Sequence, residues 1–431
     1  KELYKRIVFL RPLASDFVDV NSAFLSWEAW ERKAADPNAP DLREIPSAVG
    51  GDRQRRHGII LAKSTPAKAY HIRTGEPIVK ALEKCPTLTI VPPNFSAYVK
   101  HSRELISLLE TYAPSVEQYS IDEAFCDMTG TRALYGDPVA FAHKLKDEIR
   151  DTLGFTVNIG VSTNRLLAKM ASDFEKPDRV HTLFPDEISE KMWPLPVEEL
   201  LFVGKSTSRK LREMGITTIG QLARTDQKIL VSHFKKHGEM IWKYANGIDV
   251  SDLMTKHAQP KGYGNSVTLS RDVTDSQEAK LTLLSLCEMV GARLRADKAK
   301  ITVVCVQIRD CDFHQTSRQT QLFSPTNSTQ KIYDTACTLF DELWDHSPIR
   351  LLGVTTSKVE TPEDGFGEQL DLFDQEKAEK LRKLDCAIDA VRSKFGDDAI
   401  QRAVFMDAKK DRPFGKGGLN KAKFDDKRKK K

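Results

Sequence analysis

The sequence of 431 residues has no apolar run approaching the roughly 20 residues that a membrane-spanning helix needs. Lys1 to Arg6 lead only to a short apolar segment at 7–10, which is too brief for the core of a signal peptide. We therefore expect no membrane partner. The hydrophobic content of 40% is enough for ordinary cores, and the length favours several domains.

Cysteine pairs with metal-binding or redox spacing are also lacking. The cysteines are odd in number and scattered, and no two of them form a Cys-x-x-Cys pair. This pattern argues against a disulfide framework and a zinc site, and it favours the reducing cytoplasm as the location. The seven positions are Cys85, Cys126, Cys287, Cys305, Cys311, Cys337 and Cys386.

Excess positive charge is missing from most of the chain, although the net charge is +5. Residues 408–431 contain 11 Lys and Arg against 3 Asp, a net +8, which leaves −3 for residues 1–407. A nucleic-acid surface on the folded body would therefore depend on the local placement of Lys and Arg rather than on bulk charge.

Two adjacent acids, Asp122 and Glu123, interrupt a stretch at 116–128 that otherwise predicts a buried β-hairpin. Ionised carboxylates that are buried without partners cost several kcal/mol or must bind protons. A cation held between them is the simplest physical explanation. The alternative is an exposed hairpin turn, because a short acidic motif alone is weak evidence.

Asp19 lies in a short apolar strand predicted at 17–20, where a lone acid is unusual. Asn21 and Ser22 follow it and are predicted to cap a helix at 23–33. An acid at a strand end that faces a helix start is a candidate metal ligand. A capping or solvent-exposed acid fits the same pattern equally well.

Strands and helices alternate in the N-terminal part of the chain, which favours an α+β sheet with helices packed on one face. A small region rich in loops offers Ser64, Lys68 and Arg73, whose hydroxyl and cationic groups suit phosphates. Most such residues are solvated surface, so this assignment needs support from elsewhere. Further strands are predicted at 7–10, 58–63, 87–91 and 156–161, and further helices at 66–70, 96–111, 138–153 and 164–174.

Three motifs in this order resemble those of the Y-family, or translesion, DNA polymerases. They are Asp19 to Phe24, Ser120 to Phe125, and the segment from Asn158 through Lys169 to Lys176 and Pro177. The resemblance extends to about Glu360. Within the family, the chain resembles bacterial polymerase IV in its length and in a clamp-binding motif that is described below. It resembles the catalytic subunit of polymerase V in residues 19–21 and in Lys68.

The resemblance implies a multidomain α+β right-hand polymerase with a palm, small fingers, a helical thumb and a little finger. The little finger is also indicated by the residues themselves, because strands and helices are predicted in the order β-α-β-β-α-β. These elements are expected at 266–270, 276–295, 299–310, 315–322, 328–345 and 349–359. The expected boundaries are 1–25 and 86–184 for the palm, 26–85 for the fingers, 185–256 for the thumb, 257–264 for a linker, 265–360 for the little finger and 361–431 for a tail.

The segment at 197–216 resembles the helix-hairpin-helix of the family's thumb. Its turn at Gly204 leads into Lys205 and Ser206, where backbone N–H groups at a helix start are suited to hold a DNA phosphate. An ordinary helical hairpin is the alternative. Phe202 departs from the family, whose hairpin often has a glycine there.

By resemblance, the palm carries a site for two Mg²⁺ ions. Asp19 and Asp122 would bridge both ions, and Glu123 would bind only the ion nearest the primer hydroxyl. The Val20 carbonyl would help to hold the nucleotide ion. Phe24 matches the steric gate that crowds a ribose 2′-hydroxyl, although without Asp19 nearby a core aromatic would be the default interpretation.

The resemblance also implies substrates, which are primer-template DNA and deoxynucleoside triphosphates. Lys176, Lys68 and Ser64 are the predicted nucleotide-binding residues. Many family members have Tyr and Arg where this sequence has Thr65 and Lys68, and a lysine keeps the charge but lacks the bidentate fork. Thr65 is therefore not among the predicted ligands.

Gln369 to Phe373 resemble the peptide by which bacterial polymerases dock on the sliding clamp. Leu372 and Phe373 are adjacent apolar anchors outside any predicted core, which suits insertion into a partner's pocket. With Gln369 and Leu370 they predict clamp binding by a monomeric polymerase. The alternative is the start of a helix predicted at 375–394. The basic end beyond it is predicted to be disordered.

The function that we predict is template-directed DNA synthesis of the lesion-bypass type, by two-metal-ion phosphoryl transfer. The alternative is a non-catalytic, clamp-bound scaffold that binds DNA, and the intact Asp19, Asp122 and Glu123 argue against it. A palm-like nucleotide cyclase is a third possibility, but it leaves the thumb hairpin and the clamp peptide unexplained.

Overall fold

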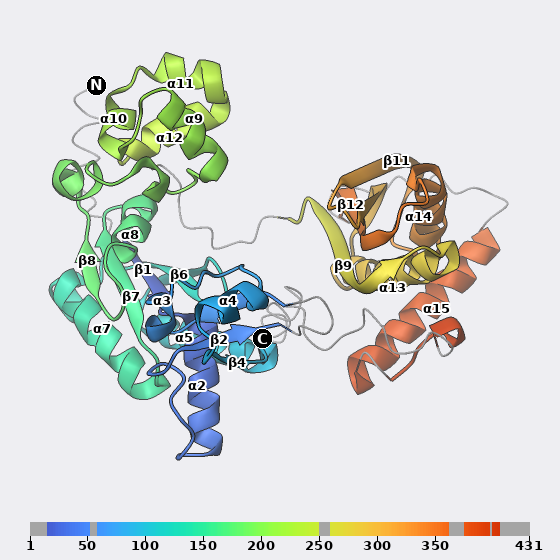
Figure 1. Ribbon diagram of the computed structural model, residues 1–431, viewed down its shortest axis with the longest axis horizontal. Helices are drawn as coiled ribbons and strands as arrows, with labels where there is room; N and C mark the ends of the chain where they lie inside the picture. Colours follow the sequence, from blue (N-terminus) through green and yellow to red (C-terminus); the bar gives the residue numbers. More distant parts are fainter. Residues whose placement is uncertain (1–14, 52–57, 250–258, 362–374, 397–398, 406–431) are drawn as a thin grey trace. The chain divides into compact units, whose positions relative to one another are not determined.

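The computed structural model describes residues 15–51, 58–249, 259–361, 375–396 and 399–405 (Figure 1). The chain forms two compact units, one of residues 1–50 and 60–257 and the other of residues 51–59 and 258–431. The predictions for the strand at 7–10, the clamp peptide and the basic end lie outside the described residues. Within the described ranges, no helix is long and apolar enough to cross a membrane.

The first unit is built on a five-stranded sheet in the order β5-β6-β1-β7-β8. β1 is its centre, and β6 and β7 both pair with it in antiparallel register. Since side chains alternate along a strand, Val18 and Val20 point to one face and Phe17 and Asp19 to the other. The strands are β1 (Ser15–Val20), β5 (Ser115–Gln118), β6 (Glu123–Asp127), β7 (Val157–Ser162) and β8 (Val180–Thr182).

Helices cover both faces of this sheet, so the predicted one-faced arrangement is wrong. Val18 packs in a core cluster to which α5 and α7 contribute, whereas Phe17 on the opposite face packs against Ala168 of α8. Gly160 of β7 permits this second layer, because a Cβ there would lie 1.9 Å from the Ala168 carbonyl oxygen. The helices are α2 (Ala23–Ala35), α5 (Phe95–Tyr112), α6 (Arg132–Tyr135), α7 (Pro138–Leu153) and α8 (Arg165–Ser172).

The start of α2 also differs from the prediction. Ser22 occupies the cap position in a left-handed conformation with φ of 48°, and its side chain makes no capping hydrogen bond. Asn21 instead directs its side chain to Asn158 and to the Asp178 backbone. Tertiary contacts have therefore replaced the local cap that the two residue types suggest.

A three-stranded sheet in the order β3-β2-β4 follows in the first unit. Ser64 is buried where β3 passes into α3, and its hydroxyl accepts from the Ala67 N–H (3.1 Å) and donates to the Ile45 carbonyl (2.8 Å). The helix predicted at 66–70 is only one turn. The elements are β2 (Ser47–Gly50), β3 (Ile60–Lys63), α3 (Thr65–Lys68), α4 (Ile78–Lys84) and β4 (Thr89–Val91).

A helical segment completes the first unit and shares one core cluster with α8. Asn164 caps α8 and also donates from Nδ2 to the Gly247 carbonyl (3.0 Å), which fastens this segment to the helix layer of the sheet. Its elements are η1 (Pro185–Glu187), η2 (Ile188–Met192), η3 (Val197–Glu199), α9 (Lys205–Glu213), α10 (Ile219–Arg224), α11 (Gln227–Phe234) and α12 (Lys236–Ala245).

The second unit contains an antiparallel sheet in the order β11-β10-β12-β9, which packs against α13 and α14. The predicted order β-α-β-β-α-β is confirmed. β9 begins at Gly262, so the linker predicted at 257–264 extends too far. The elements are β9 (Gly262–Val273), α13 (Ser276–Ala296), β10 (Lys300–Asp310), β11 (Gln315–Thr326), α14 (Thr329–Leu343), β12 (Ile349–Glu360), α15 (Gln375–Phe395) and η5 (Ala403–Phe405).

α15 is fastened to α13 by buried ion pairs, a docking that the sequence did not reveal. The Arg295 guanidinium of α13 donates to Asp389 (3.0 Å), and Glu288 of α13 accepts from Arg392 (3.0 Å). The Glu288 side chain is only 4% exposed. The helix predicted within the tail is therefore an added layer of the second unit.

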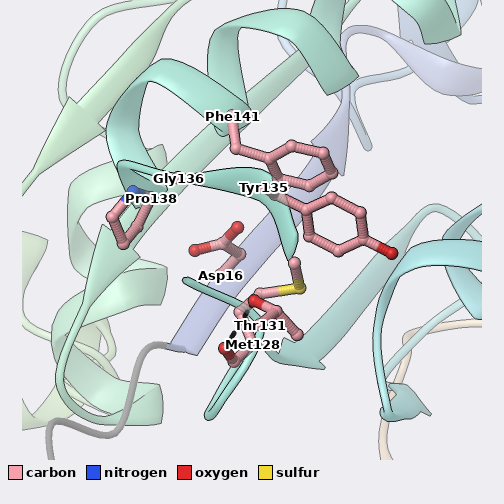
Figure 2. A pocket seen from close by; sticks show the side chains of 7 residues that line it. All are labelled: Asp16, Met128, Thr131, Tyr135, Gly136, Pro138 and Phe141. Carbon is pink, nitrogen blue, oxygen red and sulfur yellow. Dashed lines mark hydrogen bonds between the residues drawn. The ribbon is translucent and has the colours of Figure 1, made fainter. Parts of the chain in front are cut away.

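Asp16 of β1 lines a cavity of about 10 Å³ beside α7 (Figure 2). This space holds about one water molecule, so it is not a ligand pocket. Within the described part of the chain, Oδ1 of Asp16 has no hydrogen-bond partner. Burial raises the pKa of Asp16 to about 7. The other lining residues are Met128, Thr131, Tyr135, Gly136, Pro138 and Phe141.

Asp16→Asn is expected to stabilise the protein more at pH 8 than at pH 5. Because the pKa rises from 3.8 in the unfolded chain to about 7 in the fold, ionisation of Asp16 costs stability progressively across that window. The gain from Asn should be about 2–3 kcal/mol larger at pH 8, which urea unfolding at the two pH values measures. An equal gain at both pH values would show that Asp16 does not titrate in this way.

Candidate active site

The predicted acids meet at the end of β1. Asp19 lies opposite Glu123 in the antiparallel register of β1 and β6, and the Val20 N–H donates to the Asp122 carbonyl (3.0 Å). Residues directly opposite in such a pair share a face, with Cβ atoms about 4.5–5.5 Å apart. The fold thus gathers three acids from two distant parts of the chain.

Each of these carboxylates has a polar partner in the structure. No group of three or more His, Cys, Asp or Glu side chains among the described residues is arranged to hold a metal ion. The three acids are instead engaged by two ammonium groups and one hydroxyl. The pairs are Glu123 with Lys169 (2.6 Å), Asp122 with Ser120 (2.6 Å) and Asp19 with Lys176.

The acids are close enough to influence one another's protonation. Burial raises the pKa of Asp19 to about 6; Lys176 opposes this rise, and Glu123 and Asp122 add to it. Burial is also the main reason that the pKa of Asp122 lies above its usual value. Carboxylate oxygens are the ligands that a hard divalent cation such as Mg²⁺ prefers, and here they lie beside the ammonium groups of Lys169 and Lys176.

Lys176 is held between two acids. It contacts Asp19, and its Nζ lies 2.8 Å from Asp173. Burial alone would lower the pKa of Lys176, but the two carboxylates outweigh it and raise the pKa. Lys176 is therefore a fixed cation at the edge of the acidic group.

Lys169 belongs to the third sequence motif, but the sequence did not predict that its ammonium contacts Glu123. Its ammonium also lies 4.2 Å from the centre of the Phe17 ring and 5.5 Å from that of Tyr119. Cation–π attraction and the ion pair together restrict the side chain. Only the packing of α8 over β1 and β6 reveals this contact.

Phe24 lies in the first turn of α2, close in sequence to Asp19. Its half-buried ring stacks on Tyr98 of α5, with centroids 4.7 Å apart and planes inclined by 12°. The Tyr98 hydroxyl donates to Glu28 of α2 (3.0 Å), so the ring beneath Phe24 is fixed at both ends.

Three cations lie close in sequence, Lys63 at the end of β3, Lys68 in α3 and Arg73 in the loop after α3. The pKa of Lys63 on β3 is lowered, mainly by burial. The positive charge of Lys68, and to a smaller extent that of Arg73, lowers it further. Lys68 is exposed, as is Thr65. The Ser64 hydroxyl is buried within the α3 cap, so the predicted contact of its side chain with a nucleotide is replaced by a structural role.

The turn before α9 has an unusual backbone. Gly204 caps α9 in an extended conformation, and no side chain caps this helix. Phe202 adopts φ of 68°, in the left-handed region that favours glycine, which agrees with the glycine that the family pattern often has at this position. Its ring is 51% exposed.

Comparison with known proteins decides the family. Residues 18–173 match the model of the impB/mucB/samB family, residues 260–372 that family's C-terminal domain, and residues 199–249 the thumb domain of DNA polymerase iota. DNA polymerase IV of Clostridium acetobutylicum is 47% identical over 391 residues, which cover 90% of this chain and 97% of the relative. The chain belongs to the Y-family of DNA polymerases.

Further relatives agree with this assignment. DNA polymerase IV of Acetivibrio thermocellus is 38% identical to this Y-family polymerase over 371 residues, covering 85% of the chain and 92% of the relative. A solved Y-family DNA polymerase chimera matches with a TM-score of 0.69 and 22% identity, over 81% of this chain and 99% of the other, which shows a shared fold. The predicted family and fold class are confirmed.

Proposed function

We propose that this Y-family DNA polymerase extends a primer with the help of two Mg²⁺ ions held by the palm acids, and that it does so on damaged templates. The observation that carries the proposal is the pairing of Asp19 with Glu123 beside Asp122 at the end of β1. Divalent-metal dependence is general in the family, and the number and kind of ions are part of the proposal.

Asp19, Asp122 and Glu123 would hold the ions, with the Val20 carbonyl as a further oxygen donor. When bound, two such ions activate the primer hydroxyl and neutralise the charge that develops on the leaving pyrophosphate. The acids are partly buried, where charge interactions are stronger than in bulk water. Lys169 restrains the Glu123 side chain through their ion pair (2.6 Å).

Lys176 would bind the triphosphate. Its ammonium contacts Asp19, so it lies beside the acids that are proposed to hold the ions. Lys68, at the end of α3, and Arg73, in the loop that follows, would supply further positive charge for the phosphates.

Other parts of the chain position the substrates. Phe24, supported by Tyr98, would crowd a ribose 2′-hydroxyl and so favour deoxynucleotides. The backbone at Gly204, Lys205 and Ser206 would bind a DNA phosphate at the start of α9. We also propose that the protein acts in the cytoplasm as a monomer.

Primer extension tests the proposal against the alternative of a non-catalytic scaffold. The protein is incubated with Mg²⁺, deoxynucleotides and either undamaged or damaged templates, with and without the sliding clamp. We expect extension on undamaged templates and past at least some lesions. A scaffold would bind the DNA and extend neither template.

Replacing both Leu372 and Phe373 by Ala is expected to abolish stimulation by the clamp. These apolar anchors are proposed to fill a pocket on the clamp, and they lie far in sequence from the palm motifs, so extension without the clamp should be unchanged. Extension assays with a clamp titration measure both effects. Equal stimulation of the wild type and the variant would refute the docking role.

A further inference from the structure

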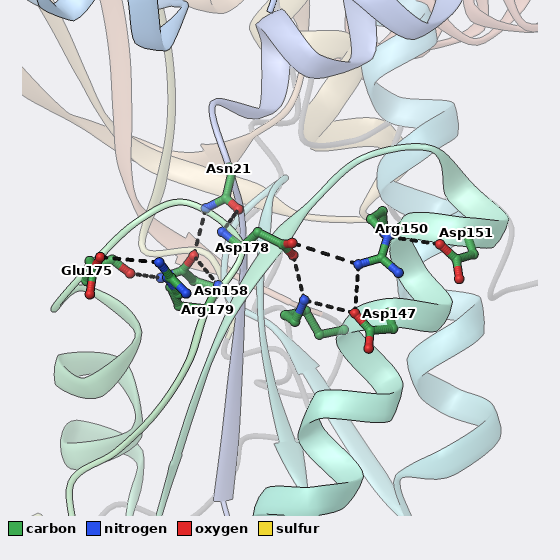
Figure 3. A network of polar contacts seen from close by, with 9 residues as sticks. Asn21, Asp147, Arg150, Asp151, Asn158, Glu175, Asp178 and Arg179 are labelled. Carbon is green, nitrogen blue, oxygen red and sulfur yellow. Dashed lines mark hydrogen bonds and ion pairs between the residues drawn. The ribbon is translucent and has the colours of Figure 1, made fainter.

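The loop that carries Lys176 is fastened to the end of β1 by two buried asparagines (Figure 3). Asn21 follows β1, and Asn158 lies on the neighbouring strand β7. Their side chains are joined by a hydrogen bond from Asn21 Nδ2 to Asn158 Oδ1 (3.1 Å). Neither residue has a role in the ion site proposed above.

Asn158 binds the loop on both sides of Lys176. Its Nδ2 donates to the carbonyls of Ser172 (3.0 Å) and Glu175 (2.7 Å), and its Oδ1 accepts from the Arg179 N–H (3.3 Å). The contacts of Asn158 with the backbone of Glu175 and Arg179 therefore lie on either side of Lys176, whose ammonium is proposed to bind the triphosphate.

Asn21 adds a third point of attachment. Its Oδ1 accepts from the Asp178 N–H (2.9 Å), and the Asp178 carboxylate in turn accepts from Lys146 of α7 (2.9 Å). Figure 3 shows Asp178 beside Asn21. The loop is thereby attached to the strand that bears Asp19 and to α7.

We propose that Asn21 and Asn158 are positioning residues that set the place of Lys176 relative to Asp19 and the triphosphate. This inference rests on the proposed role of Lys176. A lysine side chain is long and flexible, so the reach of its ammonium depends on a fixed backbone. Only an amide side chain donates to two carbonyls and accepts from N–H groups at the same time, which is what Asn158 does.

The test is a double-mutant cycle of Asn158→Leu and Lys176→Ala in the full chain, with the KM for deoxynucleotides and kcat as readouts. We expect Asn158→Leu alone to raise KM about 10-fold with less than a threefold change in kcat. In the Lys176→Ala background the same change should alter KM less than twofold, because the two residues act as one unit. Additive effects on KM, or a loss confined to kcat, would overturn the inference.

Two further variants keep the test decisive. Asn21→Ala removes only the Asn158 and Asp178 bonds and should reproduce the KM effect if Asn158→Leu does not fold; an unchanged KM would count against the inference. Asn246→Ala is the matched control, because Asn246 donates to two carbonyls in the α10–α12 region, those of Ala223 (3.3 Å) and Trp242 (2.9 Å). A comparable rise in KM in this control would indicate a general loss of structure and contradict the positioning role.

The cycle also separates this inference from the proposed function. If Lys176→Ala leaves KM at the wild-type value, the triphosphate role of Lys176 and the inference both fail. The two-ion chemistry is judged independently by the variants of Asp19 and Asp122.

Discussion

Asp19→Ala and Asp122→Ala are each expected to reduce primer extension by on the order of 10³-fold or more, since each removes a carboxylate that is proposed to be a ligand of both ions. Glu123→Ala should cost less, because Glu123 is proposed to hold only one ion. Single-turnover extension with Mg²⁺ and all four deoxynucleotides measures the three losses.

Asp127→Ala is the matched control for these variants. Asp127 lies on the same strand as Glu123 but at its other end, where its carboxylate accepts from the Thr129 N–H (2.9 Å). Its replacement should leave extension near the wild-type rate. Extension that survives in both Asp19→Ala and Asp122→Ala would refute the two-ion assignment.

Phe24→Ala is expected to raise ribonucleotide incorporation relative to deoxynucleotides by about 10²-fold, the discrimination that exclusion of one hydroxyl by an apolar side chain can supply. The ratio of kcat/KM for the two nucleotide types measures it. Tyr98→Phe is the control, since it keeps the ring stacked on Phe24 and removes only the hydroxyl bonded to Glu28. An unchanged ratio in Phe24→Ala would show that Phe24 is not the gate.

The sequence was sufficient to predict those elements whose bounds depend on residues adjacent in sequence. α7 occupies the predicted range because Asp137 caps its start, Pro138 stands in its first turn, and Gly154 ends it with φ of 76°. These preferences are properties of the residues themselves. The three acids were likewise identifiable from their motifs, although their proximity depends on the register of β1 and β6.

Other features depend on contacts between distant residues. The hydroxyl of Ser64 appeared available for a phosphate, but the Ile45 carbonyl and the start of α3 engage it. α8 covers the second face of the sheet because Gly160 leaves room for it, and the docking of α15 relies on pairs such as Arg295 with Asp389. No local pattern encodes these partners.

The partners of the acids were the least predictable part of the site. Lys169 and Lys176 follow the acidic motif in sequence, and resemblance assigned Lys176 only to the triphosphate. The structure places both ammonium groups on the carboxylates. The two lysines are therefore a part of the candidate site that the acidic motif alone did not reveal.

Counting the bound ions tests the central claim most directly. Electron paramagnetic resonance with Mn²⁺ in place of Mg²⁺ is suited to this, using the full chain, a primer that ends in a dideoxynucleotide and the next complementary deoxynucleotide. The account predicts two Mn²⁺ ions per wild-type chain and the loss of both from the Asp122→Ala variant. Two ions bound equally by the wild type and by Asp122→Ala would contradict it.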